Sequence, residues 1–204
     1  MSAVADTDLW SLCPAVYWCG TPLDVRDGEE FYDQGDVEKG RALLASSGYD
    51  GEVVVLISPN NVAWVAALGD ELGNVMESIG LTVERPYADF LIFSGMLSRT
   101  ELYDAFPVWY GYWNGGTPLN DQALSLGNRF VAHDDDLANL QEAYASETDT
   151  AKRLGIVRDI SRRRLEEAGM ILLGTFPHML PVASGLKGVQ LSALPYYGNA
   201  WLER

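Results

Sequence analysis

The segment 53–85 constrains the fold more than any other part of the chain. Residues 53–57 are a continuous aliphatic run, which is typical of a strand buried on both faces. Residues 62–79 carry apolar side chains at helical spacing and end at Gly80, and residues 81–85 have the composition of a second strand. Strand, helix and strand in this order predict a βαβ unit with parallel strands. The sequence therefore predicts an α/β fold.

A short helix is expected just before this unit. The stretch Asp36-Val-Glu-Lys-Gly-Arg-Ala-Leu-Leu-Ala-Ser-Ser-Gly-Tyr49 begins with a carboxylate that can accept hydrogen bonds from the free amides of a first helical turn. Gly48 suits the left-handed position that follows the end of a helix. An Asp-Gly turn at residues 50–51 then leads into the first strand.

Further elements follow along the chain. We expect helices over residues 89–99, 135–146 and 149–168, and strands over residues 106–113 and 170–174, while residues 1–35 and 177–204 are irregular. In the last helix the residues expected to face inward are Leu154, Val157, Ile160 and Leu165. Its other face is expected to carry Arg153, Arg158, Arg162, Arg163 and Arg164. These arginines could bind an anionic partner, but three acids on the same helix favour a solvated face or a contact within the protein.

Length and charge bound the function. A chain of 204 residues can bury one real core, and its 48% hydrophobic and 21% charged residues are ordinary for a soluble globular protein. The net charge of −15 argues against nucleic acid and against anionic membrane surfaces as partners. No apolar run is long enough to span a bilayer, and residues 1–8 lack the pattern of a signal peptide, so the chain as written is expected in the cytoplasm.

The two cysteines, Cys13 and Cys19, flank a short Pro-Ala-Val-Tyr-Trp segment. In an exported protein they could pair across a small loop, and the alternative is two free buried thiols. A metal site is not expected there, because no second cysteine pair and no nearby histidine completes four ligands.

No pattern indicates catalysis or a cofactor. The sequence has no Gly-X-Ser-X-Gly elbow, no His-Glu-X-X-His and no phosphate-binding loop, and we expect neither an enzyme nor a bound metal. The stretch His133-Asp134-Asp135-Asp136 is better explained by capping of the acidic helix than by metal binding. His178 stands alone in an expected loop and is assigned a structural role.

The candidate binding element is Phe106-Pro-Val-Trp-Tyr-Gly-Tyr-Trp-Asn-Gly-Gly-Thr117. Alternate residues of a strand share a face, which would place Trp109 and Trp113 on one side and Tyr110 and Tyr112 on the other. Aromatic walls and glycine backbone suit a ligand site. Core packing is the competing explanation for each aromatic residue except Trp113, which is followed directly by Asn114 and two glycines.

Three motifs resemble the family 5 solute-binding proteins, the receptors of peptide-type ABC importers. The 36–49 stretch is similar to that family's Asp-Pro-Glu-Lys-Ala-(Lys/Arg)-Ala-Leu-Leu-Ala-Glu-Ala-Gly-Tyr segment. Glu147-Thr-Asp-Thr-Ala-Lys-Arg153, followed by Met170-Ile-Leu-Leu-Gly174, resembles its Asp-Pro-Ala-Lys-Arg helix and apolar strand. Lys187-Gly-Val and Asn199-Ala-Trp resemble its closing segment, and Trp18-Cys-Gly-Thr-Pro-Leu23 resembles a segment of one branch.

The resemblance implies a fold and a division of the chain. It implies the second lobe of a two-lobed, periplasmic-binding-protein type II-like fold, with a mixed sheet and flanking helices. Residues 1–35 would be a hinge or interlobe segment, 36–176 the lobe, and 177–204 a segment returning toward the first lobe. Such receptors are well over twice as long, so the resemblance also implies that the chain is a part of a longer, exported protein.

The resemblance further implies that the parent captures an oligopeptide-like solute and presents it to the membrane subunits of an ABC importer. The residues it places at the solute are Trp109, Tyr110, Tyr112, Trp113, Asn114, Gly115, Gly116 and Thr117. Many peptide-binding members carry an aspartate just after this tryptophan, whereas here the next acid is Asp121. A blocked or cyclic peptide, a sugar or another amphiphile is therefore expected as readily as a peptide with a free amine.

A second class of function is an interaction or structural module. Such a module would form dimers through exposed segments in residues 1–35 and 177–204. A hydrolase with an unrecognised site is the least favoured alternative.

Overall fold

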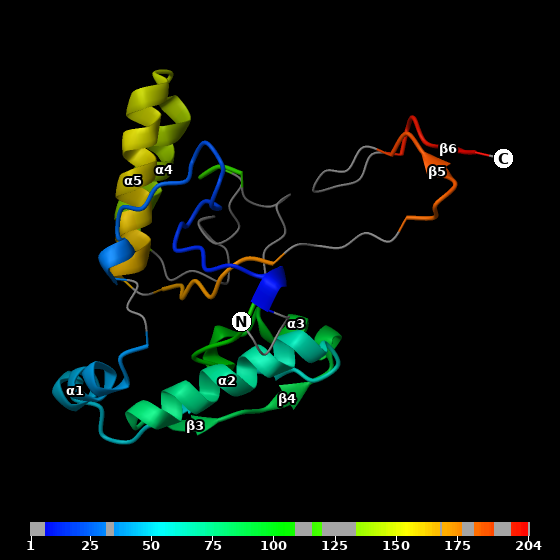
Figure 1. The fold of residues 1–204 in the computed structure, drawn as a ribbon. Coiled ribbons are helices and arrows are strands. Elements are labelled where there is room, and N and C mark those ends of the chain that lie inside the picture. Colours follow the sequence, from blue (N-terminus) through cyan, green and yellow to red (C-terminus); the bar gives the residue numbers. More distant parts are fainter. Residues whose placement is uncertain are drawn as a thin grey trace.

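The computed structural model describes residues 7–31, 35–108, 116–119, 134–167, 169–176, 182–189 and 197–203. Figure 1 shows the arrangement of the helices and strands: α1 to α3 gather with β3 and β4 in one group, α4 and α5 stand side by side in a second, and β5 and β6 lie apart from both. The helices are α1 (Val37–Ser47), α2 (Ala63–Ile79), α3 (Phe90–Met96), α4 (Asp135–Ser146) and α5 (Thr150–Glu166). The strands are β1 (Val53–Val55), β2 (Ser58–Pro59), β3 (Thr82–Glu84), β4 (Tyr87–Ala88), β5 (Leu186–Lys187) and β6 (Trp201–Leu202), and 3-10 turns occur at Thr7–Leu9, Glu29–Phe31 and Thr100–Leu102.

The predicted βαβ unit is confirmed. Strand β1 pairs in parallel with β3, with Val53 opposite Thr82, and α2 connects the two strands. Strands β2 and β4, which follow β1 and β3 respectively in the sequence, also pair in parallel. Helix α2 ends at Gly80, as predicted, and the φ of this glycine, 110°, is left-handed.

The predicted burial of the first strand on both faces is wrong at its start. Val53 is 50% exposed, whereas Leu56 and Ile57 are almost completely buried. The apolar cluster explains the gradient: Ile57, Phe93 and Leu97 form its centre, and α3 covers this end of the unit. Burial therefore follows the position of α3 and not the aliphatic run itself.

The helix starts follow the sequence closely. Asp36 accepts a hydrogen bond from the amide of Lys39 at 2.9 Å, and Gly48 has a φ of 87°, as expected for the two ends of α1. Asp134 and Asp149 cap α4 and α5 in the same way. An aspartate before each of these three helices was the signal, and side-chain capping is local enough to be predicted without tertiary information.

A second core joins α4 and α5 to the N-terminal segment. Its buried residues are Tyr17, Val25, Leu137, Tyr144, Val157 and Ile160. Residues 16–25, expected to be irregular, contain no regular helix or strand, yet Tyr17 and Val25 pack against buried residues of α4 and α5. Their packing partner lies within this chain.

Two predicted strands are not formed in the described residues. Phe106–Val108 is not in a strand, and the remainder of the predicted 106–113 strand lies outside the described residues. Residues 170–174 are also not a strand, and Ile171 is exposed. The residue that follows this apolar run, Thr175, forms an antiparallel bridge with Ser11.

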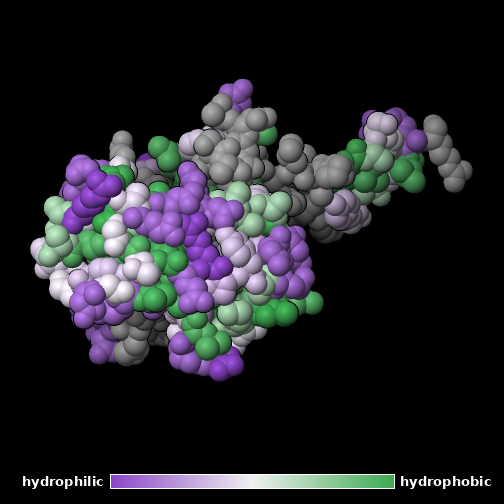
Figure 2. Space-filling model, turned by 90° about the horizontal axis from the view of Figure 1, so that it is seen from below, coloured by the Kyte–Doolittle hydropathy of each residue, from purple (hydrophilic) through white to green (hydrophobic). Residues whose placement is uncertain are grey.

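The β5–β6 pair forms a small antiparallel hairpin that stands away from the helices (Figure 1). Figure 2 shows the molecule from below, with apolar and polar residues interspersed over the main body and apolar residues again on the extension at the right. Trp201 and Leu202 are 57% and 69% exposed. Gly188 has a φ of 73°, and any side chain there would collide with Asn199 and Trp201, so glycine is required at this turn.

Among the helices that the structure describes, none combines the length and the apolar character needed to cross a bilayer.

Candidate functional site

Most of the predicted ligand residues cannot be placed. Trp109, Tyr110, Tyr112, Trp113, Asn114 and Gly115 lie outside the described residues. Gly116 is exposed, and Thr117 is partly buried. The structure does show how the residues on either side of this segment are held.

The first flank belongs to the βαβ unit. Ala105 forms a parallel bridge with Leu56, and its carbonyl accepts a hydrogen bond from the amide of Ile57 at 3.1 Å. The carboxylate of Asp104 accepts one from the amide of Val55 at 2.8 Å. The chain therefore continues the parallel pairing at the edge of β1 just before the aromatic segment begins.

Phe106 is a core residue and not a ligand contact. Its ring lies 5.4 Å from the ring of Tyr103 and 6.4 Å from that of Phe93, both edge-to-face. Pro107 is buried next to Gly69 of α2. The next residue, Val108, is 37% exposed, so the chain emerges at the surface just before Trp109.

The second flank belongs to the helical pair. Pro118 is fully buried, and its carbonyl accepts a hydrogen bond from the side chain of Gln141 in α4 at 3.0 Å. The candidate segment is thus fixed at one end to the βαβ unit and at the other end to α4.

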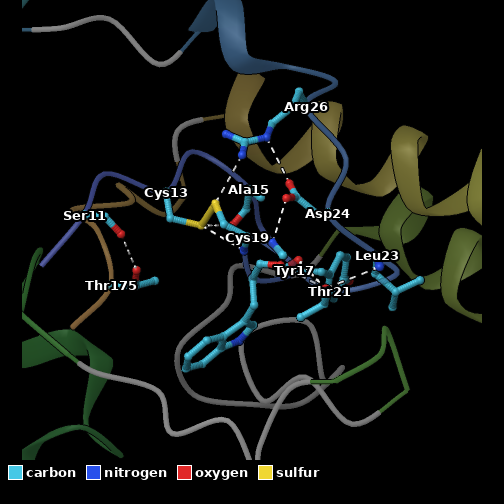
Figure 3. The surroundings of a disulfide bond; sticks show 12 residues. Ser11, Cys13, Ala15, Tyr17, Cys19, Thr21, Leu23, Asp24, Arg26 and Thr175 are labelled. Atoms are coloured by element: carbon cyan, nitrogen blue, oxygen red, sulfur yellow. Dashed lines mark hydrogen bonds and ion pairs between the residues drawn. A yellow bond between two sulfur atoms is a disulfide. The ribbon is translucent and has the colours of Figure 1, made fainter. Parts of the chain in front are cut away.

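The disulfide loop is the best-defined polar constellation in the described part of the chain (Figure 3). Cys13 and Cys19 are joined in a disulfide. The amide of Cys19 donates to the sulfur of Cys13 at 3.0 Å, and the guanidinium of Arg26 donates to the sulfur of Cys19 at 3.4 Å. Asp24 orients this guanidinium through an ion pair at 2.9 Å, and its second oxygen accepts from the amide of Gly20 at 2.8 Å.

The arginine face of α5 is largely used within the chain. Arg158 and Arg162 pair with Asp27 and Glu30 of the N-terminal segment at 3.7 and 2.5 Å. The guanidinium of Arg153 lies 4.2 Å above the ring of Tyr144. Of the two readings of this face, the structure favours a contact within the protein over an anionic partner.

Arg163 connects α5 to the start of α4. It donates to the carboxylate of Asp134 at 3.0 Å and also pairs with Asp136 and Glu167. The hydrogen bond from Arg163 holds the pKa of the Asp134 carboxyl below its ordinary value, and the amides of Leu137 and Asp136 act in the same direction. Within the described residues no group of histidine, cysteine and acidic side chains is arranged to hold a metal ion, and His133 and His178 lie outside them.

The placement of Arg164 on the exposed face was wrong. Only 4% of Arg164 is exposed. It lies seven residues after Val157 and therefore falls on the same stripe of the helix as the buried residues Val157 and Ile160. The long hydrocarbon stem of arginine allows it to pack on an apolar face.

A shallow groove of about 550 Å³ runs along α4 and α5. Both acidic and basic side chains line it, namely Asp136, Asp159, Arg162, Arg163 and Glu166, together with Asn139, Leu140 and Ala143. Most of these charges already pair with one another or with the N-terminal segment, so the groove offers no single sign of charge to a ligand.

Comparison with known proteins identifies the fold of this chain. No family model and no curated protein matches the sequence. Several solved structures match closely in shape. The putative peptide-binding protein AppA from Clostridium difficile has a TM-score of 0.78 at 16% identity, over 99% of this chain and 44% of its own. The ABC transporter substrate-binding protein CtaP from Listeria monocytogenes has a TM-score of 0.75 at 21% identity, over 86% of this chain and 37% of its own.

The chain has the fold of a part of the ABC transporter substrate-binding proteins. The binding protein AgaA from A. tumefaciens R10, solved with agropinic acid, agrees, with a TM-score of 0.71 at 20% identity over 85% of this chain and 37% of its own. The expected α/β class and the family 5 resemblance are confirmed at the level of the fold. The chain spans only 37–44% of the length of these structures. The descriptions of these three neighbours are those of binding proteins.

Proposed function

We propose that this chain is part of the solute-binding component of an ABC importer and contributes the segment 109–117 to the site for an oligopeptide-like solute. The observation that carries the proposal is the fold shared over most of the chain with substrate-binding proteins such as AppA and CtaP. The parent would act in the periplasm or at the cell surface and deliver its solute to the membrane subunits of the importer.

The chemistry of the segment supports a solute with apolar groups. Its four aromatic residues offer wide apolar surfaces, and Gly115 and Gly116 leave backbone groups accessible for hydrogen bonds. Both flanks are fixed, at Ala105 and Pro118, so the segment is held at its ends before a solute arrives. Fixed ends lower the entropy that a segment loses when it binds a solute.

The missing acid after Trp113 defines the class of solute more closely. A free peptide amine would need a carboxylate nearby, and the nearest one in the sequence is Asp121. We therefore propose that a peptide without a required free amine, such as a blocked or cyclic peptide, is bound at least as well as a linear one. AgaA, solved with agropinic acid, shows that this fold can hold a ligand whose name is not that of a peptide.

Binding by the chain alone is expected to be weak. Substrate-binding proteins close two lobes around the solute, and this chain spans less than half the length of its structural neighbours. With part of the cleft, the affinity should be roughly millimolar, about −4 kcal/mol. Nanomolar affinity for these 204 residues would contradict the idea of a partial cleft.

Nuclear magnetic resonance of the tryptophan indoles tests the site directly. The chain has six tryptophans, and each indole signal can be assigned by a Trp→Phe variant. The probes are an acetylated and amidated tripeptide, the same tripeptide with free ends, and a tetrasaccharide. We expect the indole signals of Trp109 and Trp113 to shift in a saturable way, with the blocked tripeptide at least as effective as the free one.

The matched control is Trp201, an exposed tryptophan on the β5–β6 hairpin. Its indole signal should not respond, and Trp201→Ala should leave the titration unchanged, whereas Trp113→Ala should abolish it. Shifts confined to Trp201, or no shift in any indole at 20 mM probe, would overturn the proposed site.

The hairpin supports self-association as a second candidate function. Trp201 and Leu202 are exposed on an element that stands away from the main body. Sedimentation of the chain and of Trp201→Ser tests this candidate, with Leu43→Ser on the exposed face of α1 as the control. A dimer lost only in Trp201→Ser would favour the interaction module. A monomer in all three samples would exclude dimerisation through the hairpin.

A further inference from the structure

We propose that the Cys13–Cys19 disulfide is a site of thiol–disulfide exchange, opened by a dithiol reductant that attacks the sulfur of Cys19. The proposal concerns a part of the molecule outside the candidate solute site and does not depend on the transport function. It rests on the groups that surround the two sulfurs, on their unequal burial and on the backbone between them (Figure 3).

Each sulfur faces a donor that would stabilise it as a thiolate. The amide of Cys19 lies 3.0 Å from the sulfur of Cys13, and the guanidinium of Arg26 lies 3.4 Å from the sulfur of Cys19. A nearby cation or amide lowers the pKa of a thiol and favours its anion. Reduction produces two thiolates or thiols in place of an uncharged disulfide, so these donors favour the reduced form.

The charged groups around Arg26 set the size of this effect. Asp24 pairs with the guanidinium at 2.9 Å and partly offsets its charge, but it also fixes the side chain in reach of Cys19. The carboxylate of Asp27 pairs with Arg158 of α5. Because Arg26 is partly exposed, salt should weaken its influence on the sulfur.

Burial selects the sulfur that is attacked. Only 3% of Cys13 is exposed, whereas Cys19 is partly buried. A reductant thiolate would form a bond to the sulfur of Cys19, the Cys13–Cys19 bond would break, and its electron pair would leave on Cys13 as a thiolate held by the Cys19 amide. The second thiol of the reductant, after losing its proton, then attacks its own sulfur in the mixed disulfide, which releases the Cys19 thiolate beside Arg26 and leaves the reductant oxidised.

The backbone inside the ring favours opening. Trp18, directly before Cys19, has a φ of 33°, a conformation that a bulky side chain adopts rarely and at an energetic cost. Tyr17, in the same ring, is buried in the core that α4 and α5 share with the N-terminal segment. Opening the ring would relax Trp18 and loosen Tyr17, so the redox state of the disulfide would control how firmly this segment is held.

The experiment compares the wild-type chain with Arg26→Gln, Arg26→Lys and Arg41→Gln. Arg41 is an exposed arginine on α1, paired with Glu38, and is the matched control. Each protein is equilibrated in glutathione buffers of known ratio, its thiols are labelled with a maleimide, and the rate of reduction by dithiothreitol is followed. A melt of each variant confirms that it is folded.

Arg26→Gln should shift the equilibrium toward the disulfide and slow reduction by about threefold to tenfold, the size expected for a change of up to one unit in thiol pKa. Arg26→Lys should keep most of the wild-type behaviour, and Arg41→Gln all of it. In 1 M NaCl the wild type should approach Arg26→Gln. The mixed disulfide with glutathione should map to Cys19.

Equal equilibria and rates for the wild type, Arg26→Gln and Arg41→Gln would overturn the proposal, and so would a mixed disulfide that maps to Cys13. In that case the disulfide is a permanent cross-link.

Discussion

The two cores of the molecule are assembled from different kinds of sequence. The core of the βαβ unit, centred on Ile57, Phe93 and Leu97, is built from one continuous stretch of the chain, residues 55–106. The core of the helical pair is built from three separate stretches, 16–25, 137–144 and 154–160. The first core depends on local connections. The second depends on an irregular segment that a disulfide closes into a loop and that ion pairs hold on α5. Contacts within one continuous stretch can be predicted from a sequence more readily than contacts between distant stretches.

The largest expected effect on stability comes from removing one buried side chain from each core. Ile57→Ala and Ile160→Ala should each lower the free energy of unfolding by about 2–5 kcal/mol, because both side chains are almost fully buried. Hydrogen exchange should show lost protection in residues 53–106 for Ile57→Ala and in α4, α5 and residues 16–25 for Ile160→Ala. The control is Val75→Ala on the exposed side of α2, expected within about 0.5 kcal/mol of the wild type. If both core variants lose protection throughout, the two cores form one cooperative unit and the comparison fails.

The disulfide should matter for one core only. Replacing both cysteines by serine should cost roughly 2–3 kcal/mol, because a loop of six-residue separation limits the unfolded chain only modestly. The loss should appear in urea unfolding followed by the fluorescence of the N-terminal aromatic residues, while the exchange protection of β1, α2 and β3 stays unchanged. Reduced protection of β1 would show that the N-terminal segment also supports the βαβ unit.

Replacing either of two helical glycines by alanine should change the stability of the chain by a smaller amount, and the two changes should have opposite signs. A Cβ at Gly69 of α2 would lie 2.5 Å from the hydroxyl oxygen of buried Ser58, so Gly69→Ala should destabilise the chain by about 1–3 kcal/mol. A Cβ at Gly155 of α5 meets no described atom within 4 Å, so Gly155→Ala should stabilise it by about 0.5–1 kcal/mol. Thermal unfolding of the pair checks the sign. A stabilising Gly69→Ala would mean that α2 can move away from β2.

The smallest expected effect concerns Asp134, which caps α4 and pairs with Arg163. Asp134→Ala should cost about 1 kcal/mol at neutral pH, and Asp134→Asn less, because asparagine still caps the helix. The pKa of the Asp134 carboxyl is lowered in the folded chain, so the ion pair contributes fully above the unfolded value of about 3.9 and its contribution is lost as pH falls through the folded value. Melts from pH 7 to pH 2 should therefore show a steeper acid loss in the wild type than in Asp134→Asn. If both proteins lose the same stability as the pH falls, the Asp134–Arg163 ion pair does not stabilise the fold.

The elements that could be predicted from the sequence are those with local causes. The aspartate caps at Asp36, Asp134 and Asp149 and the glycine ends at Gly48 and Gly80 depend on hydrogen bonds within one turn. The parallel pairing of β1 with β3 follows from the length of the connecting helix. The α/β class was therefore within reach of pattern analysis.

The features that could not be predicted depend on distant partners. Nothing near Tyr17 in the sequence indicates that it packs on α4 and α5. The apolar run 170–174 was interpreted as a strand, but the bridge forms one residue later, between Thr175 and the distant Ser11. Arg164 could have been placed correctly, since it lies on the helical stripe of Val157 and Ile160, but its charge was given more weight than its position.

The candidate site stays a prediction from the sequence. The segment 109–117 remains a prediction, and the structure adds its two fixed ends, one at Ala105 through the bridge to Leu56 and one at Pro118 through Gln141. Neither anchor has a sequence signature, because each is a contact between segments at least 23 residues apart. The division into residues 1–35, 36–176 and 177–204 is likewise a prediction, although residues 16–25 pack within the chain.

The central claim, that this chain carries part of a solute site, is tested most directly by thermal melts with and without the blocked tripeptide. At a concentration tenfold above a millimolar Kd, a ligand that binds only the folded chain stabilises it by about 1.4 kcal/mol. For a chain of this size the midpoint should rise by about 3–5 °C. We predict that rise for the wild type and none for Trp113→Ala, while Trp201→Ala should behave as the wild type does. No rise in the wild type, or the same rise in Trp113→Ala, would contradict the account.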